Sequence, residues 1–317
     1  MAKTAFLFPG QGAQHIGMGR DFFEQIRESK EIFKEADEAL QMDLSGLIFE
    51  GSEEDLKKTE NTQPAILTAS IAMLKALERD GIYCDYTAGL SLGEYSSLVM
   101  SKAIRFADAL KIVRERGRFM QEAVPQGIGG MAAILGLDRA HLPAILEMSK
   151  SYGVVEVANY NSPEQIVISG MKEGLKIACD KAVELGAKKA VELPVSAPFH
   201  TSLLSSAGVK LEGELRKVEL GELKTKVVSN VDGRVVETSD ELVSKLVNQV
   251  SNSVLWQQSI EFMINEGVDT FVEIGPGKSL SGFAKRISKA MGKEVRILNV
   301  SSVESYKETV EKLTKGA

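Results

Sequence analysis

Gly89-Leu90-Ser91-Leu92-Gly93 decides the fold of this chain, because it has the G-x-S-x-G spacing of a nucleophile elbow. It follows a short strand-like run at 86–88 and precedes a helical run at 94–100. A turn this tight leaves no room for side chains at its two glycines, and it presents the serine hydroxyl at a helix N-terminus, where free N–H groups favour negative charge. Such a pattern also arises by chance in a glycine-rich chain, but the strand-turn-helix context favours a functional serine.

Length and composition are those of a globular enzyme. The 317 residues suffice for one large domain with a smaller insert, and 44% hydrophobic and 26% charged residues are ordinary proportions. The net charge of −6 disfavours a nucleic-acid partner. No apolar run approaches the ~20 residues that cross a bilayer, and the short apolar start before Pro9 is not typical of a signal peptide. Cys84 and Cys179 offer no disulfide framework and no metal-binding spacing, so we expect a cytoplasmic protein without a metal.

Strands and helices alternate over most of the chain, which predicts an α/β fold with a mostly parallel sheet. The strand candidates are 4–8, 86–90, 226–230, 270–274 and 295–300. Helical periodicity covers roughly 20–40, 62–80, 105–123, 239–251 and 279–291.

The middle of the chain has a different order of elements. Its predicted order is strand, helix, strand, strand, helix, strand, at 131–135, 139–149, 154–158, 165–169, 175–185 and 189–195. This βαββαβ order is that of a ferredoxin-like unit. We therefore expect a small subdomain at 127–197, inserted between the two parts of a large subdomain at 1–126 and 198–317. A cleft between the two would be the place for a small-molecule site.

A serine hydroxyl needs a base, and the chain has three histidines. His200 leaves a strand at the subdomain boundary and is the first candidate, with a purely structural histidine as the alternative. His15 is the second candidate, and His141 lies in a charged helical stretch that favours a solvated residue. In hydrolases the triad usually runs serine, acid, histidine, but here 117 residues with further helices and strands follow His200 and no H-G-G-G loop precedes Ser91, so we expect something other than an acid, such as a backbone carbonyl, to orient His200.

Arg116 and the turn at Gly10-Gln11-Gly12 are the other candidates. At helical spacing Arg116 shares its face with Ile112, Val113, Phe119 and Met120, so it lies on the apolar stripe. A buried guanidinium keeps its charge and needs an anionic partner, which is either an internal acid or a substrate carboxylate. The glycine turn follows the first strand and is either an ordinary turn or a donor of N–H groups to an oxyanion.

Several separated motifs together resemble one family. They are Phe8-Pro9-Gly10-Gln11-Gly12, Gly89-Leu90-Ser91-Leu92-Gly93-Glu94-Tyr95, Arg116-Gly117-Arg118-Phe119-Met120-Gln121 and Pro198-Phe199-His200. In this order and spacing the chain resembles the malonyl-coenzyme A:acyl carrier protein transacylase family, and it is similar also to acyltransferase domains of polyketide synthases.

The resemblance implies a hydrolase-like large subdomain and a role for each site residue. Ser91 would be the nucleophile and His200 the base, oriented by the backbone carbonyl of Gln249. The remaining implied roles are the malonyl carboxylate for Arg116, oxyanion N–H donors for Gln11 and Leu92, and malonyl selectivity for Phe199.

The resemblance also implies a reaction and its partners. The malonyl group would pass from malonyl-coenzyme A to acyl carrier protein through a serine ester, for fatty-acid biosynthesis, with a coenzyme A thioester as substrate and no bound cofactor. A trans-acting acyltransferase of polyketide synthesis is the alternative, and an esterase or thioesterase a further one. We expect a monomer with no membrane partner, and carrier docking on Lys188, Lys189, Lys285 and Arg286.

Two positions depart from the pattern of many members. Leu90 replaces a histidine before the nucleophile, which predicts a drier pocket wall. Ser253 replaces a proline after Asn252, which predicts a less rigid loop and weakens the expected role of Gln249.

Overall fold

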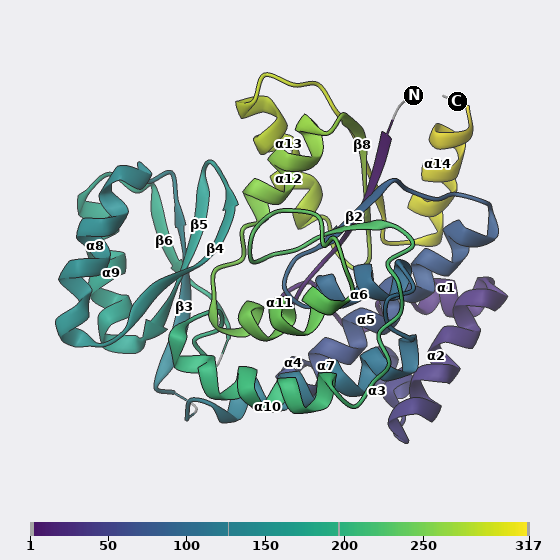
Figure 1. The fold of residues 1–317 in the computed structure, drawn as a ribbon, viewed down its shortest axis with the longest axis horizontal. Helices are drawn as coiled ribbons and strands as arrows, with labels where there is room; N and C mark the ends of the chain where they lie inside the picture. Colours follow the sequence, from purple (N-terminus) through teal and green to yellow (C-terminus); the bar gives the residue numbers. More distant parts are fainter. Residues whose placement is uncertain (1–2, 126, 196, 316–317) are drawn as a thin grey trace.

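The strands form two separate sheets that lie side by side in Figure 1. The computed structural model describes residues 3–125, 127–195 and 197–315. A five-stranded sheet has the order β7-β2-β1-β8-β9, and a four-stranded sheet has the order β4-β5-β3-β6. The second sheet and its two helices form the lobe at the left of Figure 1.

The five-stranded sheet is parallel in every described ladder. Its strands are β1 (Lys3–Phe8), β2 (Tyr86–Gly89), β7 (Lys226–Val228), β8 (Val268–Ile274) and β9 (Arg296–Val300). Phe6 and Phe8 join one hydrophobic cluster, while Ala5 and Leu7 join another. Because side chains alternate along a strand, β1 buries both of its faces, as the strands of parallel sheets do. The predicted α/β class with a mostly parallel sheet is confirmed.

Helices of the large lobe cover both faces of this sheet. Those that match the predicted ranges are α1 (Arg20–Gln25), α2 (Arg27–Leu40), α5 (Thr59–Arg79), α7 (Phe106–Glu122), α11 (Asp240–Ser251) and α13 (Ser279–Ala290). The others are α3 (Leu44–Glu50), α4 (Glu53–Lys57), α6 (Gly93–Met100), α10 (Ser205–Leu215), α12 (Trp256–Asn265) and α14 (Val303–Thr314). The single helix predicted at 20–40 is wrong, because Ile26 is extended (φ −124°, ψ 116°) and separates α1 from α2.

The smaller lobe is antiparallel throughout the described ladders. It consists of β3 (Gly129–Leu135), α8 (Leu142–Ser149), β4 (Val155–Ser162), β5 (Gln165–Met171), α9 (Lys172–Glu184) and β6 (Lys189–Glu192). Its element order is the predicted βαββαβ order of a ferredoxin-like unit. The last strand ends at Glu192 rather than at 195, because Pro194 has no N–H for the ladder.

The two lobes meet where β4 runs beside the segment that follows α11. Tyr160 N–H donates to Val254 O at 3.0 Å, and Val254 N–H donates to Ala158 O at 2.8 Å. The subdomain limits, 1–126 with 198–317 and 127–197, stay a proposal, and residue 126 lies outside the described residues. The contact matters for the site because Gln249 lies at the end of α11, next to this junction.

Candidate functional site

A sharp turn between β2 and α6 presents Ser91. Ser91 has a φ of +54°, a strained value for a residue with a side chain. A Cβ added to Gly89 would lie 1.9 Å from the carbonyl carbon of Gly93, and one added to Gly93 would lie 2.1 Å from Phe8 O. Both glycines are therefore required by the close approach of backbone to backbone, as expected from the motif.

His200 lies directly beside the serine. Its Nε2 is 2.8 Å from Ser91 Oγ, and its Nδ1 is 2.8 Å from the carbonyl oxygen of Gln249. A carbonyl only accepts, so Nδ1 carries the proton and Nε2 is left to accept from the Ser91 hydroxyl. The structure thus brings together Ser91, His200 and the Gln249 carbonyl, which lie far apart in the sequence.

The pKa of His200 is lowered to about 4, first by burial of the imidazole and then by the positive charge of Arg116. The neutral imidazole, which can accept a proton, therefore persists from neutral pH down to about pH 4. In a nuclear magnetic resonance titration, the imidazole signal that is missing in His200→Ala should stay unshifted until the pH approaches 4. A midpoint near the ordinary value of about 6.5 would contradict this description of the site.

Arg116 is buried in α7, as the apolar stripe predicts. Its Nη2 donates to Ser91 Oγ at 3.2 Å and to Gln249 Oε1 at 2.9 Å, and its Nη1 donates to Gln63 Oε1 at 2.8 Å. Among the described residues no carboxylate lies within ion-pair distance of it. The alternative of an internal salt bridge is therefore wrong for this part of the chain.

Two backbone N–H groups next to the serine are free. Within residues 3–125, 127–195 and 197–315, neither Leu92 N–H nor Gln11 N–H has an acceptor. Leu92 is the residue before α6, and a Cβ on Gly10 would lie 2.4 Å from Leu90 O, so the turn that carries Gln11 abuts the elbow. Free donors at a helix N-terminus can hold an anionic oxygen.

Asn230, Glu94 and Gln63 surround these residues and have no predicted role. Asn230 Oδ1 accepts from Ser91 N–H at 2.6 Å, and its Nδ2 donates to Gly89 O at 2.7 Å, so this side chain fastens the strained elbow. Glu94 Oε2 accepts from Gln249 Nε2 at 2.7 Å and from Asn230 N–H at 3.2 Å. Glu94 stands in the quoted motif, whereas nothing local in the sequence marks the other two.

Ser253, where a looser loop is expected, makes a contact that ties the loop to the smaller lobe. The Ser253 hydroxyl donates to Val157 O at 2.5 Å, so it fastens the loop to β4 in a way that a proline could not. This contact offers the loop an anchor in place of the proline, and the expected lower rigidity stays a prediction.

The other candidates, His15, His141 and Phe199, make no hydrogen bond to Ser91 in the described structure. His15 is exposed, and within the described residues its imidazole makes a single hydrogen-bond contact, Nδ1 at 3.4 Å from Ala13 O. His141 ends the short helix at 139–141 and does not contact Ser91. Phe199 is buried beside His200 and packs in a hydrophobic cluster that includes residues of both lobes.

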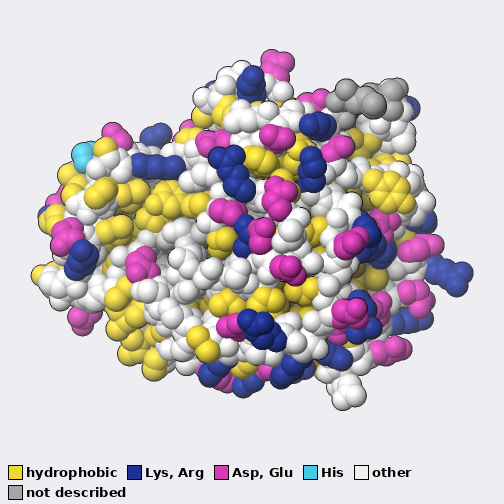
Figure 2. All heavy atoms as spheres, viewed as in Figure 1, with side chains coloured by type: hydrophobic (Ala, Val, Ile, Leu, Met, Phe, Trp, Pro, Cys, Tyr) yellow, Lys and Arg dark blue, Asp and Glu magenta, His cyan; other side chains and the backbone are white. Residues whose placement is uncertain are grey.

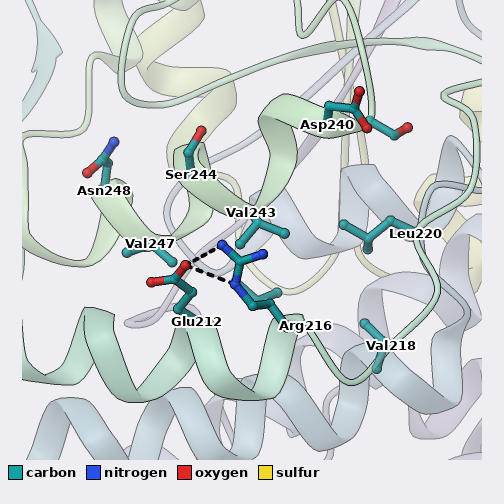
Figure 3. A pocket seen from close by; sticks show the side chains of 11 residues that line it. Glu212, Arg216, Val218, Leu220, Asp240, Val243, Ser244, Val247 and Asn248 are labelled. Atoms are coloured by element: carbon teal, nitrogen blue, oxygen red, sulfur yellow. Dashed lines mark hydrogen bonds and ion pairs between the residues drawn. The ribbon is translucent and has the colours of Figure 1, made fainter.

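A cavity of about 540 Å³ lies between α10 and α11 (Figure 3). An ion pair between Glu212 and Arg216 lies along its wall, with Val243 and Val247 opposite. Ser91, His200 and Arg116 are not among its lining residues, so this cavity is separate from the serine site.

The described part of the chain has neither a metal-binding cluster nor a helix that could span a membrane. It contains no group of three or more His, Cys, Asp or Glu side chains that could hold a metal ion. Every helix in residues 3–125, 127–195 and 197–315 is too short or too polar to cross a bilayer.

Comparison with known proteins places this geometry in a family. Residues 5–305 match the family described as Acyl transferase domain. The malonyl CoA-acyl carrier protein transacylase of Bacillus subtilis (strain 168) is 47% identical over 305 residues, which are 96% of each chain. The chain belongs to the malonyl CoA-acyl carrier protein transacylase family. The resemblance seen in the sequence motifs is confirmed, and the chain is an acyltransferase.

Solved structures of this transacylase family have the same fold. That of the Clostridium perfringens malonyl CoA-acyl carrier protein transacylase is 50% identical, has a TM-score of 0.94, and covers 99% of this chain and 98% of its own. A malonyl-transacylase in complex with a type II PKS acyl-carrier protein is 38% identical with a TM-score of 0.94, over 98% of this chain and 100% of its own. The two-lobed arrangement is therefore that of the transacylase family.

Proposed function

We propose that the chain transfers the malonyl group of malonyl-coenzyme A to the phosphopantetheine thiol of acyl carrier protein, for fatty-acid biosynthesis. The observation that supports this most strongly is the position of Ser91 Oγ, 2.8 Å from a base at His200 Nε2 and 3.2 Å from the cation at Arg116 Nη2. The nucleophile, its base and a guanidinium that can bind a carboxylate therefore lie within hydrogen-bond distance of one another at Ser91 Oγ. The relatives are named for the same acyl donor, malonyl-coenzyme A, and the same acyl acceptor, acyl carrier protein.

The first half of the reaction forms an ester. Ser91 Oγ attacks the thioester carbonyl while His200 Nε2 takes the hydroxyl proton. The tetrahedral oxyanion is held by the free N–H groups of Leu92 and Gln11, and such donors have been worth roughly 3–4 kcal/mol each in other enzymes. The C–S bond then breaks, and His200 gives its proton to the coenzyme A thiolate.

The second half reverses these roles with a new thiol. His200 takes the proton of the phosphopantetheine thiol, and the sulfur attacks the malonyl ester carbonyl. When the C–O bond breaks, the proton returns to Ser91 Oγ. The same two oxyanion donors serve both halves, so one site suffices for the complete transfer.

Arg116 and Phe199 select the acyl group in this proposal. A planar guanidinium binds a carboxylate through two parallel charge-assisted hydrogen bonds, and that of Arg116 already reaches Ser91 Oγ. In a malonyl group one methylene carbon separates the carboxylate from the thioester carbonyl, which matches the closeness of Arg116 to Ser91 Oγ. The ring of Phe199, next to His200, would crowd a branch on that methylene carbon.

A transfer assay tests the proposal. Purified chain is mixed with malonyl-, methylmalonyl- or acetyl-coenzyme A and with holo carrier protein of either fatty-acid or type II polyketide synthesis. We expect malonyl transfer to the fatty-acid carrier to be fastest. Preference for the polyketide carrier would favour the alternative pathway, which the relative in complex with such a carrier keeps open. Rapid hydrolysis of malonyl-coenzyme A without any carrier would instead indicate a thioesterase.

Carrier docking, oligomeric state and location complete the proposal. The proposed carrier-docking residues Lys188, Lys189, Lys285 and Arg286 are exposed, and none forms an ion pair within the described residues. Basic and acidic side chains are interspersed on the face shown in Figure 2, so an acidic carrier would be steered by local rather than net charge. A monomer in the cytoplasm remains our expectation.

A further inference from the structure

Two uncharged side-chain amides hold the Arg116 guanidinium. Gln63, on α5, and Gln249, on α11, are each 1% exposed, and each turns its Oε1 atom to one Nη atom of Arg116, at 2.8 Å and 2.9 Å. A guanidinium only donates, so the oxygen end of each amide must face it. The guanidinium is therefore fixed in orientation from two different helices.

The chain keeps its nearby buried acid away from this guanidinium. Glu94 is 1% exposed, and its Oε2 accepts from Gln249 Nε2 at 2.7 Å, so the Gln249 amide stands between the carboxylate and Arg116. Burial is the main cause that lowers the pKa of Arg116 and also the main cause that raises the pKa of Glu94 to about 7. In a directly paired acid and guanidinium, the pKa of the acid would instead be lowered and that of the guanidinium raised.

This arrangement suits a guanidinium whose charge is meant for a ligand. A carboxylate in place of either amide would accept the same hydrogen bond and would neutralise Arg116 at once. We propose that Gln63 is a specificity-determining residue, whose uncharged amide orients Arg116 while leaving its positive charge to the carboxylate of the acyl group. This inference rests on the proposed function and adds to it a reason for the residue type at position 63.

Gln63→Glu tests the inference, because it changes charge while nearly preserving shape. The new carboxylate would pair with Arg116 and repel a malonyl carboxylate, and like charges brought together at a buried site cost several kcal/mol. We expect kcat/KM for malonyl-coenzyme A to fall on the order of 100-fold, mainly through KM. Transfer of acetyl, which has no carboxylate, should change less than about threefold.

Two further variants serve as controls. Gln63→Met removes the acceptor without adding charge, and we expect it to weaken malonyl transfer less than about tenfold. Gln257→Glu makes the same chemical change elsewhere, because Gln257 Oε1 accepts from Arg139 Nη2 at 2.5 Å. It should leave the ratio of malonyl to acetyl transfer unchanged. Thermal unfolding of each variant shows that it is folded.

The outcomes separate this inference from the proposed function. An unchanged malonyl KM in Gln63→Glu would overturn the inference, and so would equal losses for malonyl and acetyl, because these indicate a structural role. Either result leaves the proposed function standing if the unmodified chain transfers malonyl. Failure of the unmodified chain to do so would instead overturn the function.

Discussion

Ser91→Ala is expected to lower kcat for malonyl transfer by about 10⁴-fold or more, because loss of a nucleophile in a serine enzyme removes covalent catalysis as a whole. Ser91 Oγ is the one atom that both His200 Nε2 and Arg116 Nη2 contact in the described structure. The measurement is the steady-state rate of malonyl transfer from malonyl-coenzyme A to holo carrier protein.

Ser96→Ala is the matched control. Ser96 lies on α6, only five residues further along, and its buried hydroxyl has no hydrogen-bond partner among the described residues. We expect this variant to retain the unmodified rate within about twofold, since no bond is lost. Transfer at more than about a tenth of the normal rate by Ser91→Ala would exclude Ser91 as the nucleophile.

Arg116→Ala is expected to cost about 2–5 kcal/mol of malonyl transition-state binding, which is roughly 30- to 5,000-fold in kcat/KM. The reason is that a buried guanidinium, already oriented by two amides, provides the charge for the substrate carboxylate. Acetyl transfer should fall far less, because an acetyl group has no carboxylate and leaves the native guanidinium unpaired. The ratio of malonyl to acetyl transfer should therefore fall by most of the factor expected for the loss in malonyl kcat/KM.

Arg118→Ala is the control for this second prediction. Arg118 lies two residues away on the same helix, but it is exposed and pairs with Glu115 and Glu122 at the surface. Exposed ion pairs are worth about 0–1 kcal/mol, so the malonyl-to-acetyl ratio should stay unchanged. An unchanged ratio in Arg116→Ala as well would remove Arg116 from the role of carboxylate fork.

Local patterns in the sequence predict the elbow, the order of elements and the burial of Arg116. Each depends on residues close together along the chain: two glycines around a serine, alternating strands and helices, and an apolar stripe at helical spacing. Two errors in element bounds differ in kind. Pro194, a local signal, ends a strand early, whereas Ile26 is extended inside a helical period that does not mark it.

The contacts that orient the site are long-range and have no local signature. Gln63 and Gln249 reach Arg116 from 53 and 133 positions away, and Asn230 reaches Ser91 from 139 positions away. A glutamine on a helix or an asparagine after a strand is common, and only the packing of α5, α7 and α11 gives these amides their partners. The resemblance to a family supplied the Gln249 carbonyl, but not the second contact made by the Gln249 side chain.

Mass spectrometry of the chain, quenched within one turnover of mixing with malonyl-coenzyme A, tests the central claim most directly. We expect the added mass of one malonyl group on the peptide that contains Ser91, with no such addition in Ser91→Ala. Malonyl on a different residue, or release of coenzyme A with no modified peptide, would contradict the serine-ester route.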